Sequence, residues 1–445
     1  MCKKLKINKP MKNNISRRFF VKTVAFGATA PFILPSHIWS AEVKPNDKIT
    51  MGFIGVGTQG RYLLGGFMND PQVQVLAVCD VDTTRREFSK KTVEDFYSKK
   101  TGQDYKGCDA YNDFRDLLKR KDIDTVCIAT PDHWHAIPAI LACKEGKDIY
   151  CEKPLSLTIA EARAMVKAVR KYNRVFQTGS MQRSSREFLK ACELVRNGKI
   201  GEVKEVYVNV GGPSKWCDLP EEPMEPGLDW NMWLGQAPMR PYNSVLSPRG
   251  VHKHFPAWRN YREYSGGGMT DWGAHHFDIA QWGLGMDESG PTEIYPPDGK
   301  EFKRLTYKYA NGVVMYHGGL SGYNYGVVFV GTKGKICVDR GRFLAEPEEI
   351  AADYKIGSDK IKLYQSSNHL KDFLNCVKSR QRPICDVEIG CRSVTVCHLG
   401  NLAYWYKRPL KWDPVKERFI GDEEANTWLD RPKRAPWDKA IEGVI

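Results

Sequence analysis

The chain has 445 residues, 42% of them hydrophobic and 27% charged, with a formal net charge of +14. These values exclude a disordered chain and a small disulfide-stabilised protein, and they predict two or three domains. No apolar run is long enough to span a membrane. Eight of the Lys and Arg residues lie in residues 1–41, which contain no Asp or Glu. Subtracting these eight leaves +6 over residues 42–445, so the charge does not indicate nucleic-acid binding.

Residues 1–41 have the pattern of a targeting segment. A basic stretch leads into the twin arginine of residues 16–22 (SRRFFVK), and residues 23–34 are mostly small or apolar. This order is typical of a signal peptide, and the twin arginine favours the export route that carries folded proteins. The alternative is an amphipathic first helix, but the apolar run is unpatterned and ends near Pro31 and Pro35. We therefore expect a twin-arginine signal peptide over residues 1–41 and a periplasmic location. The thirteen cysteines show no disulfide or metal-site spacing, and we expect no metal.

The first folded unit begins with a strand that leads into a glycine-rich turn. The buried strand 48–54 is followed by Gly-x-Gly-x-x-Gly and then by a helical stretch, residues 61–68. In such a turn the first glycine allows a tight bend, the second lets a pyrophosphate approach the backbone, and the third packs the helix on the strand. The helix N-terminus supplies N–H donors for the phosphates. The turn residues expected to contact a dinucleotide are Gly55, Gly57, Thr58, Gln59 and Gly60.

A carboxylate follows the second predicted strand at the spacing of a ribose-binding residue. The strand 73–79 ends at Asp80, twenty residues after Gly60. Arg85 follows closely and could accommodate a 2′-phosphate. NAD is therefore the favoured cofactor, and NADP remains an alternative. The other interpretation is a glycine turn and a surface Asp in an unrelated α/β domain.

Two further strands deliver polar motifs to the same sheet edge. The strand 124–129 leads to Thr130-Pro131, and the strand 148–151 leads to Glu152-Lys153. Open α/β sheets bind ligands at the carboxyl ends of their strands, so Lys153 can meet a substrate hydroxyl there. The alternative for Lys153 is an ordinary surface lysine. A helix over 159–171 and a strand over 175–178 close a domain assigned to residues 42–180. The further cofactor-binding candidates are Thr130, Pro131, His135, Glu152 and Lys153, although His135 also suits a structural role.

The second half, residues 181–445, becomes strand-rich, as in an α+β domain. Residues 211–265 are rich in Pro, Trp and Tyr and suit an aromatic cleft wall for a sugar, although ordinary packing explains most of these side chains. Three glycines then precede Asp271 and His275, which are spaced i and i+4 and would share one helical face. His275 could take a proton from a hydroxyl, with Asp271 as its carboxylate partner. A satisfied His–Asp pair of purely structural importance is the alternative.

The glycine turn, Ala129-Thr130-Pro131, Glu152-Lys153-Pro154 and the segment from Gly266 to His275 occur in one order that resembles the Gfo/Idh/MocA family of NAD(P)-dependent sugar and cyclitol oxidoreductases. The resemblance implies a Rossmann domain followed by an α+β domain with a large, mostly antiparallel open sheet. That sheet often forms the oligomer interface, so a homo-oligomer, a dimer or tetramer, is expected. The resemblance also implies that Lys153, Asp271 and His275 form the catalytic trio.

Export adds a constraint, because the compartment beyond the inner membrane has no known supply of free nicotinamide cofactor. We therefore expect an oxidoreductase acting on a sugar, glycoside or cyclitol hydroxyl, with a tightly bound and internally recycled cofactor. The alternative is an NAD-dependent glycoside hydrolase of the kind found in this family, which oxidises, eliminates and reduces in turn. A second alternative is a non-catalytic accessory protein that keeps the Rossmann fold.

Overall fold

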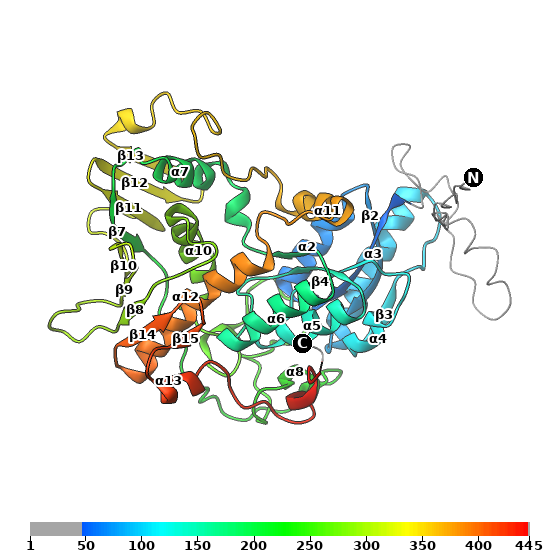
Figure 1. The fold of residues 1–445 in the computed structure, drawn as a ribbon. Coiled ribbons are helices and arrows are strands. Elements are labelled where there is room, and N and C mark those ends of the chain that lie inside the picture. The colour runs from blue at the N-terminus through cyan, green and yellow to red at the C-terminus, as the bar shows by residue number, and fades with distance from the viewer. Residues whose placement is uncertain (1–46, 444–445) are drawn as a thin grey trace, which may run out of the picture.

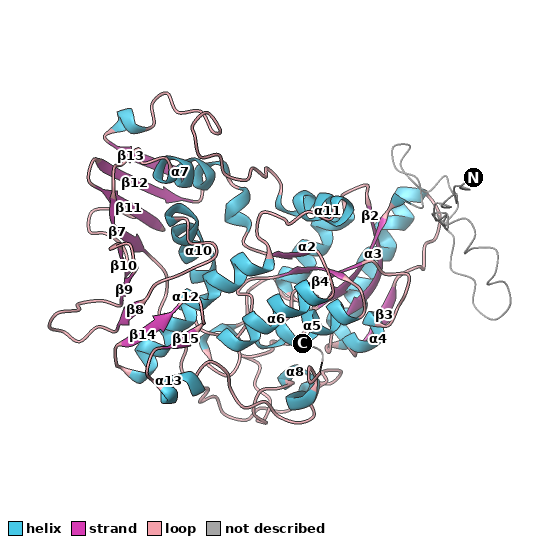
Figure 2. Ribbon diagram, viewed as in Figure 1, coloured by secondary structure: helices cyan, strands magenta, loops and turns pink. Residues whose placement is uncertain are grey.

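The computed structural model describes residues 47–443, so the expected signal peptide lies outside the described residues. The described chain forms two sheet-centred units, with the parallel sheet on the right of Figure 1 and the larger sheet on the left. Figure 2 shows that helices fill the space between the two sheets. The predicted fold class is confirmed.

The first sheet is parallel, and its strands are rich in buried Val, Ile and Cys, as expected when helices cover both faces. The strand order is β3-β2-β1-β4-β5-β6. The chain adds strands on one side of β1 up to β3 and then crosses to the other side with β4, and such a switch point leaves a crevice at the carboxyl ends of the strands. The strands are β1 (Ile49–Ile54), β2 (Val73–Cys79), β3 (Asp109–Tyr111), β4 (Thr125–Ile128), β5 (Asp148–Cys151) and β6 (Phe176–Thr178).

Helices connect these strands by crossovers. They are α2 (Thr58–Met68), α3 (Thr83–Thr101), α4 (Phe114–Leu118), α5 (Ala136–Lys144) and α6 (Ile159–Lys171). Helix α2 begins three residues before the predicted start, because the glycine turn itself provides its N-cap at Gly57. No prediction covers α3 or β3: α3 consists mostly of polar and charged residues, and β3 has only three residues.

The second sheet has nine strands in the order β13-β12-β11-β7-β10-β9-β8-β14-β15. Only β7 and β10 pair in parallel, and the other neighbours are antiparallel. The strands are β7 (Val203–Val208), β8 (Glu293–Tyr295), β9 (Thr306–Lys308), β10 (Val314–His317), β11 (Val327–Gly331), β12 (Gly334–Asp339), β13 (Arg342–Glu346), β14 (Leu410–Asp413) and β15 (Arg418–Phe419).

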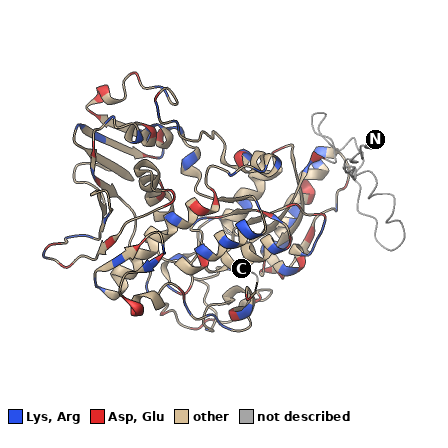
Figure 3. Ribbon diagram, viewed as in Figure 1, with Lys and Arg blue, Asp and Glu red and all other residues tan. Residues whose placement is uncertain are grey.

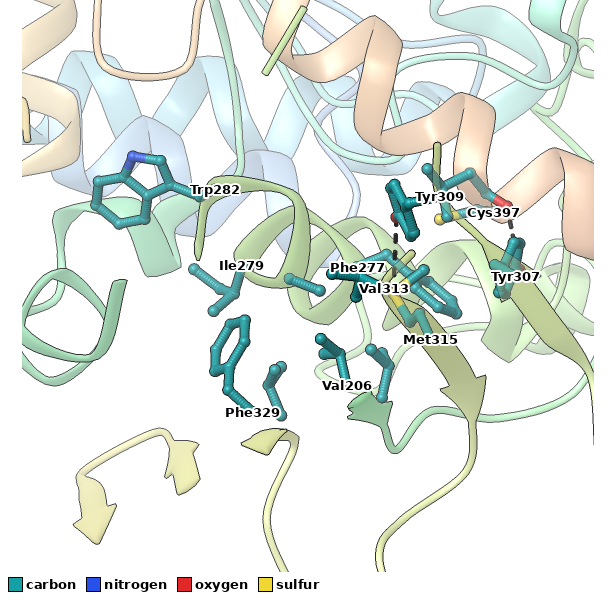
Figure 4. Close-up of a cluster of buried hydrophobic side chains, with 14 of the residues drawn as sticks. Val206, Phe277, Ile279, Trp282, Tyr307, Tyr309, Val313, Met315, Phe329 and Cys397 are labelled. Carbon is teal, nitrogen blue, oxygen red and sulfur yellow. Dashed lines mark hydrogen bonds between the residues drawn. The ribbon is translucent and has the colours of Figure 1, made fainter. Parts of the chain in front are cut away.

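Helices lie on the face of this sheet that is turned toward the first unit (Figure 1). The helices of the second half are α7 (Arg186–Arg196), α8 (Trp230–Leu234), α9 (Gly268–Asp271), α10 (Gly273–Leu284), α11 (His369–Ser379), α12 (Val387–Tyr406) and α13 (Glu423–Thr427). Figure 4 shows Phe277 and Ile279 of α10 directed at the sheet residues Val206 and Phe329, and all four are fully buried. This packing fixes the position of α10, whose first turn carries His275.

Late segments of the chain return to the first unit. Phe373 of α11 packs edge-on against Phe67 of α2, with 6.2 Å between ring centroids. The tail residue Trp437 packs against Trp134, with 4.7 Å between centroids. In space, therefore, the second half of the chain also completes the core of the first unit, and the domain boundary near residue 180 stays a prediction.

Acidic and basic side chains are interspersed over the described chain (Figure 3). Within residues 47–443, no helix has both the length and the apolar character needed to cross a membrane. The same residues contain no group of three His, Cys, Asp or Glu side chains that could hold a metal ion.

Candidate active site

A cavity of about 860 Å³ opens at the carboxyl ends of the parallel strands and extends toward the second sheet. Its volume is in the range of a ligand-binding cleft. Every predicted cofactor-binding residue lines it except Gly60 and His135. The Trp- and Tyr-rich segment 211–265 contributes a wall, as predicted, through residues that include Trp233, Phe255 and Trp258.

The glycine turn has the shape of a phosphate cradle. A Cβ atom at Gly60 would lie 2.0 Å from the carbonyl oxygen of Gly55, so only glycine lets α2 approach the turn this closely. A Cβ at Gly57 would meet no protein atom within 4 Å, because that position faces the open cavity. The backbone N–H groups that begin α2 therefore face a space that protein does not fill, which fits a dinucleotide pyrophosphate.

Asp80 stands at the end of β2, where a ribose-binding carboxylate is expected. Its carboxylate accepts one hydrogen bond from Val56 N (2.9 Å) and one from Asp82 N (3.0 Å), which leaves lone pairs for ribose hydroxyls. Burial raises the pKa of Asp80. Arg85, the candidate for a 2′-phosphate, is instead held by protein oxygens, including Ser247 Oγ at 3.2 Å. A carboxylate with no free arginine beside it fits NAD better than NADP.

Residues 246–256, which we call the cover loop, come from the second half of the chain and lie over the glycine turn. Thr58 Oγ1 donates to the carbonyl of His254 (2.8 Å), and Arg85 Nε donates to the carbonyl of Gly250 (3.2 Å). Arg61 also donates to a carbonyl of the loop, that of His252. The cover loop therefore closes the dinucleotide end of the cavity with several hydrogen bonds.

Two side chains that were predicted to bind the cofactor instead make their polar contacts within the protein. Glu152 is buried and accepts hydrogen bonds from Gln59 Nε2 (2.9 Å) and from Lys153 N (3.2 Å), so it holds the turn and the strand end together. His135 lies away from the cavity wall, with Nδ1 2.7 Å from Pro154 O and Nε2 3.0 Å from Thr130 O. Burial lowers the pKa of His135 to about 4. The geometry thus favours the structural interpretation of His135.

Lys153 and Asp271 meet at the other end of the cavity. Lys153 Nζ lies 2.7 Å from Asp271 Oδ1 and 3.0 Å from the Asp271 carbonyl oxygen. The side chains are 17% and 23% exposed. Arg259 Nε is 3.7 Å from the same carboxylate oxygen. Burial raises the pKa of Asp271, but the charges of Lys153 and Arg259 outweigh it and hold that pKa below its ordinary value.

The expected pairing of Asp271 with His275 on one helix is wrong. Helix α9 ends at Asp271 and α10 begins at Gly273, and His275 N donates to Trp272 O (3.0 Å) rather than to Asp271 O. The carbonyl of Asp271 is thereby free to accept from Lys153. The interruption falls at Trp272, between the two helices, whereas the glycine segment fixes where α9 begins: Gly267 has φ +78°, and a Cβ there would lie 2.4 Å from Ser214 N.

His275 lines the cavity and has no side-chain hydrogen bond among residues 47–443. It is 7% exposed, and its Nδ1 is fully enclosed. Burial, followed by the charges of Lys153 and Arg340, holds the pKa of His275 well below its ordinary value. The imidazole is therefore neutral at neutral pH and can accept a proton. The adjacent His276 is engaged elsewhere, with Nδ1 3.2 Å from Asn209 O, which favours His275 as the acting imidazole.

The structure also brings to the cavity three polar side chains that the sequence did not single out for the site: Asp132, Arg259 and Arg340. Asp132 is buried, accepts from Ser265 Oγ (2.6 Å), and burial raises its pKa to about 7. Asp132 directly follows the Thr-Pro motif, so its place after β4 was a usable signal. Arg259 lies in a short 3-10 helix, residues 257–260, and Arg340 lies in a hairpin turn; no sequence pattern marks either arginine.

Two family models match the chain. Residues 49–180 match the NAD-binding Rossmann fold of the Gfo/Idh/MocA oxidoreductase family, and residues 194–439 match the C-terminal alpha/beta domain of that family.

A curated relative from Shewanella oneidensis, named alpha-N-acetylgalactosaminidase, is 31% identical over 212 residues, which cover 43% of this chain and 45% of that protein. A protein from Shewanella pealeana, named as a glycosyl hydrolase family 109 protein, is 30% identical over 205 residues, which cover 42% of this chain and 44% of that protein. The chain thus matches a little under half the length of these relatives.

Among solved structures, the WlbA dehydrogenase from Bordetella pertussis, in complex with NADH and UDP-GlcNAcA, superposes with a TM-score of 0.57 at 15% identity, covering 82% of this chain and 99% of that one. At such an identity the likeness shows the fold alone. The two family models together cover most of the described chain. The chain therefore belongs to the Gfo/Idh/MocA family of oxidoreductases, and its first unit is an NAD-binding Rossmann domain.

Proposed function

We propose that the protein oxidises a hydroxyl of a sugar, glycoside or cyclitol by hydride transfer to NAD held in this cavity. The observation that carries the proposal is one cavity with the glycine turn at one end and Lys153, Asp271 and an unpartnered His275 at the other. Bound nicotinamide would supply the hydride acceptor, and the protein would supply binding, orientation and proton transfer.

The side chains divide the remaining work. His275, neutral and without a protein partner, accepts the proton of the substrate hydroxyl. Lys153 donates a hydrogen bond to the same oxygen and stabilises its developing negative charge. Asp271 holds the Lys153 ammonium through both its carboxylate and its carbonyl oxygen, so it acts as a positioning residue for the lysine.

We propose that the cofactor stays bound between turnovers and is recycled within each cycle. The cover loop supports this, because its hydrogen bonds to Thr58, Arg61 and Arg85 lie across the dinucleotide end of the cavity. The protein purified as residues 42–445 should release stoichiometric NAD or NADH when denatured, identified by mass spectrometry. Empty protein that also fails to bind added NAD would overturn the proposed function and revive the accessory interpretation.

A matched pair of variants tests the role of the cover loop. Arg85→Gln removes a guanidinium that bonds the cover loop, and we expect the dialysed protein to lose NAD about tenfold faster. Arg86→Gln is the control, since Arg86 bonds Asp80 O (2.8 Å) and Asn112 Oδ1 (3.1 Å) but contacts no residue of the cover loop. Equal nucleotide loss from both variants would contradict a retaining role for the loop.

The second candidate is an NAD-dependent glycosidase, favoured by the similarity to the relatives named alpha-N-acetylgalactosaminidase and glycosyl hydrolase family 109 protein. The same His275 and Lys153 would serve, because that chemistry also begins with oxidation of a ring hydroxyl. The assay that separates the candidates is release of 4-nitrophenol from nitrophenyl glycosides without any added redox partner. Release supports the glycosidase, whereas oxidation of the sugar with no release supports the oxidoreductase.

We propose export through the twin-arginine route, on the basis of residues 16–22 alone. The test is fractionation of cells that express the full chain and the double variant Arg17→Lys with Arg18→Lys. Periplasmic recovery of the unaltered chain and cytoplasmic retention of the variant are the expected results. Equal recovery of both in the cytoplasm would overturn the proposal.

We also propose that the protein forms a homo-oligomer through the nine-stranded sheet. The face away from α10 carries the half-buried pair Tyr207 and Tyr316, with ring centroids 5.1 Å apart, and Arg304 lies over Tyr207. Light scattering on the purified protein should give the mass of a dimer or tetramer, and a monomer mass at micromolar concentration would contradict this.

A further inference from the structure

We propose that the substrate carries an anionic substituent, a carboxylate or a sulfate or phosphate ester, which the guanidinium of Arg340 binds at the rim of the cavity. The inference rests on the proposed function, because it names the class of sugar that this site takes. Three observations support it: the position of the Arg340 side chain, the absence of a carboxylate beside its guanidinium, and the Gln182 side chain that connects it to His275.

Arg340 belongs to the turn between β12 and β13, and this turn is where the nine-stranded sheet reaches the cavity. Both Arg340 and Gly341 line the cavity wall beside Trp272 and His275. The guanidinium lies over the Trp272 ring, with its central carbon 4.8 Å from the ring centroid. Stacking of this kind restricts a long side chain that would otherwise be free to move.

A single amide connects Arg340 to the helix that carries His275. With its amide nitrogen and oxygen assigned so that both find partners, the Gln182 side chain donates to the carbonyl of His275 (3.0 Å) and accepts from Arg340 Nε (3.2 Å). Because Nε is used in this way, the two terminal nitrogens of the guanidinium stay available as a planar fork. An anion bound to that fork would therefore sit at a fixed place relative to the imidazole.

The neighbouring carboxylates do not neutralise Arg340. Asp339, the residue before it, pairs through Oδ2 with Arg342 (2.8 Å). Asp271 is shared between Lys153 and Arg259. Within residues 47–443, no carboxylate lies within 4.0 Å of the Arg340 guanidinium, and its terminal nitrogens have no protein acceptor.

A free guanidinium fork is the group that best matches a planar or tetrahedral oxyanion, because two parallel N–H donors meet two oxygens. The hydroxyl that is oxidised would be bound by Lys153 and His275. An anionic group bound by Arg340 at the rim would therefore be a substituent on a different carbon of the sugar. Trp272, which is 44% exposed, also lines the cavity, and its ring supports the guanidinium that lies over it.

Binding of matched sugars to the NAD-bound protein tests the proposal without requiring turnover. The probes are D-glucuronate, D-galacturonate, D-glucose 6-sulfate and D-glucose 6-phosphate, each compared with its neutral sugar by titration calorimetry. The variants are Arg340→Gln and its control Arg342→Gln. Arg342 is the first residue of β13, directly after the turn; it is already paired with Asp339 and does not line the cavity.

We expect at least one anionic sugar to bind about 10- to 100-fold more tightly than its neutral counterpart, the range of one charge-assisted contact. Arg340→Gln should remove that preference, and Arg342→Gln should keep it. Preference for the uronates identifies a carboxylate, and preference for the esters identifies a tetrahedral anion. Equal affinity for neutral and anionic sugars, binding of none of the anionic probes, or equal losses in the two variants would overturn the proposal.

The outcomes also separate this inference from the proposed function. If Arg340-dependent binding of anionic sugars occurs but no sugar transfers hydride, the proposed function fails and the anion site stands. If sugars are oxidised but anionic and neutral sugars bind equally well, and Arg340→Gln changes the affinity for neither, the proposed function stands and the anion site fails.

Discussion

Replacing Lys153 by Met tests the chemistry assigned to the far end of the cavity. Methionine keeps the length and apolar stem of lysine but removes the ammonium that lies 2.7 Å from Asp271 Oδ1. The substitution therefore removes one hydrogen-bond donor to the reacting oxygen and one counter-charge to Asp271. It leaves the glycine turn, Asp80 and the cover loop unchanged, so NAD binding should persist.

Two magnitudes follow from the geometry. Loss of a single donor to a developing oxyanion lowers kcat by about 10²- to 10³-fold. Breaking a buried ion pair costs about 3–5 kcal/mol, but these side chains are 17% and 23% exposed and Arg259 lies 3.7 Å from the same carboxylate. We therefore expect the free energy of unfolding to fall by only about 1–2 kcal/mol. Without Lys153, burial should also raise the pKa of Asp271.

The assay is single-turnover reduction of the bound nicotinamide, followed by its absorbance, with a sugar that the unaltered protein oxidises. Thermal unfolding and the nucleotide content of Lys153→Met establish that the variant is folded and holds cofactor. Lys153→Arg is the second variant: it keeps the charge but changes the shape of the donor, and it should recover only part of the rate. A Lys153→Met protein that binds NAD and transfers hydride within about threefold of the original rate would refute the assignment.

Two further predictions concern the turn and a buried imidazole. Gly57→Ala should fold normally and bind NAD about tenfold or more weakly, because its Cβ would enter open cavity. Gly60→Ala should instead lower the melting temperature, because its Cβ would lie 2.0 Å from Gly55 O. Calorimetry measures the stability of each variant, and titration with NAD measures its affinity. A similar loss of stability in both variants would contradict the assignment of the glycine turn as a phosphate-binding site. Burial lowers the pKa of His398 to about 4, and Ser156 O lies 3.0 Å from its Nε2. Below pH 6.5 the unfolded chain takes up a proton that the folded protein excludes, so this histidine should remove about 3 kcal/mol of stability between pH 6.5 and pH 4. The measurement is the difference in unfolding free energy between the protein and His398→Asn across that range, with NMR titration of the ring; a ring that titrates near pH 6.5 in the folded protein would contradict it.

The fold was predictable where one local rule decides the outcome. The strand–glycine turn–helix order and the apolar runs of β1, β2, β4 and β5 identify the parallel sheet. Strands that are buried on both faces must be almost continuously apolar, and this pattern is visible in the sequence. Helix α12 begins at Val387 because the side chain of the N-cap Asp386 accepts a hydrogen bond from Glu388 N (3.1 Å). The return of Phe373 and Trp437 to the first core could not be predicted, because contacts between distant segments leave no periodic pattern.

The candidate site divides in the same way. Lys153, Asp271 and His275 do line one cavity, as their motifs suggested, but the sequence spacing of Asp271 and His275 predicted the wrong pair. An i, i+4 spacing places two side chains on one face only if the helix is continuous, and here the helix is interrupted at Trp272, directly after Asp271.

The break has a chemical consequence for the proposed mechanism. A histidine paired with a carboxylate would have a raised pKa and would be charged over part of the physiological range. By giving Asp271 to Lys153, the structure leaves His275 neutral, and the charge of Lys153 itself lowers the His275 pKa further. A base must be unprotonated before it can act, and a donor to an oxyanion must be charged to stabilise it well. The Lys153–Asp271 pair meets both requirements. The Asp271 carboxylate holds the lysine in place, and because this carboxylate is not bonded to His275, the imidazole stays neutral and can accept a proton.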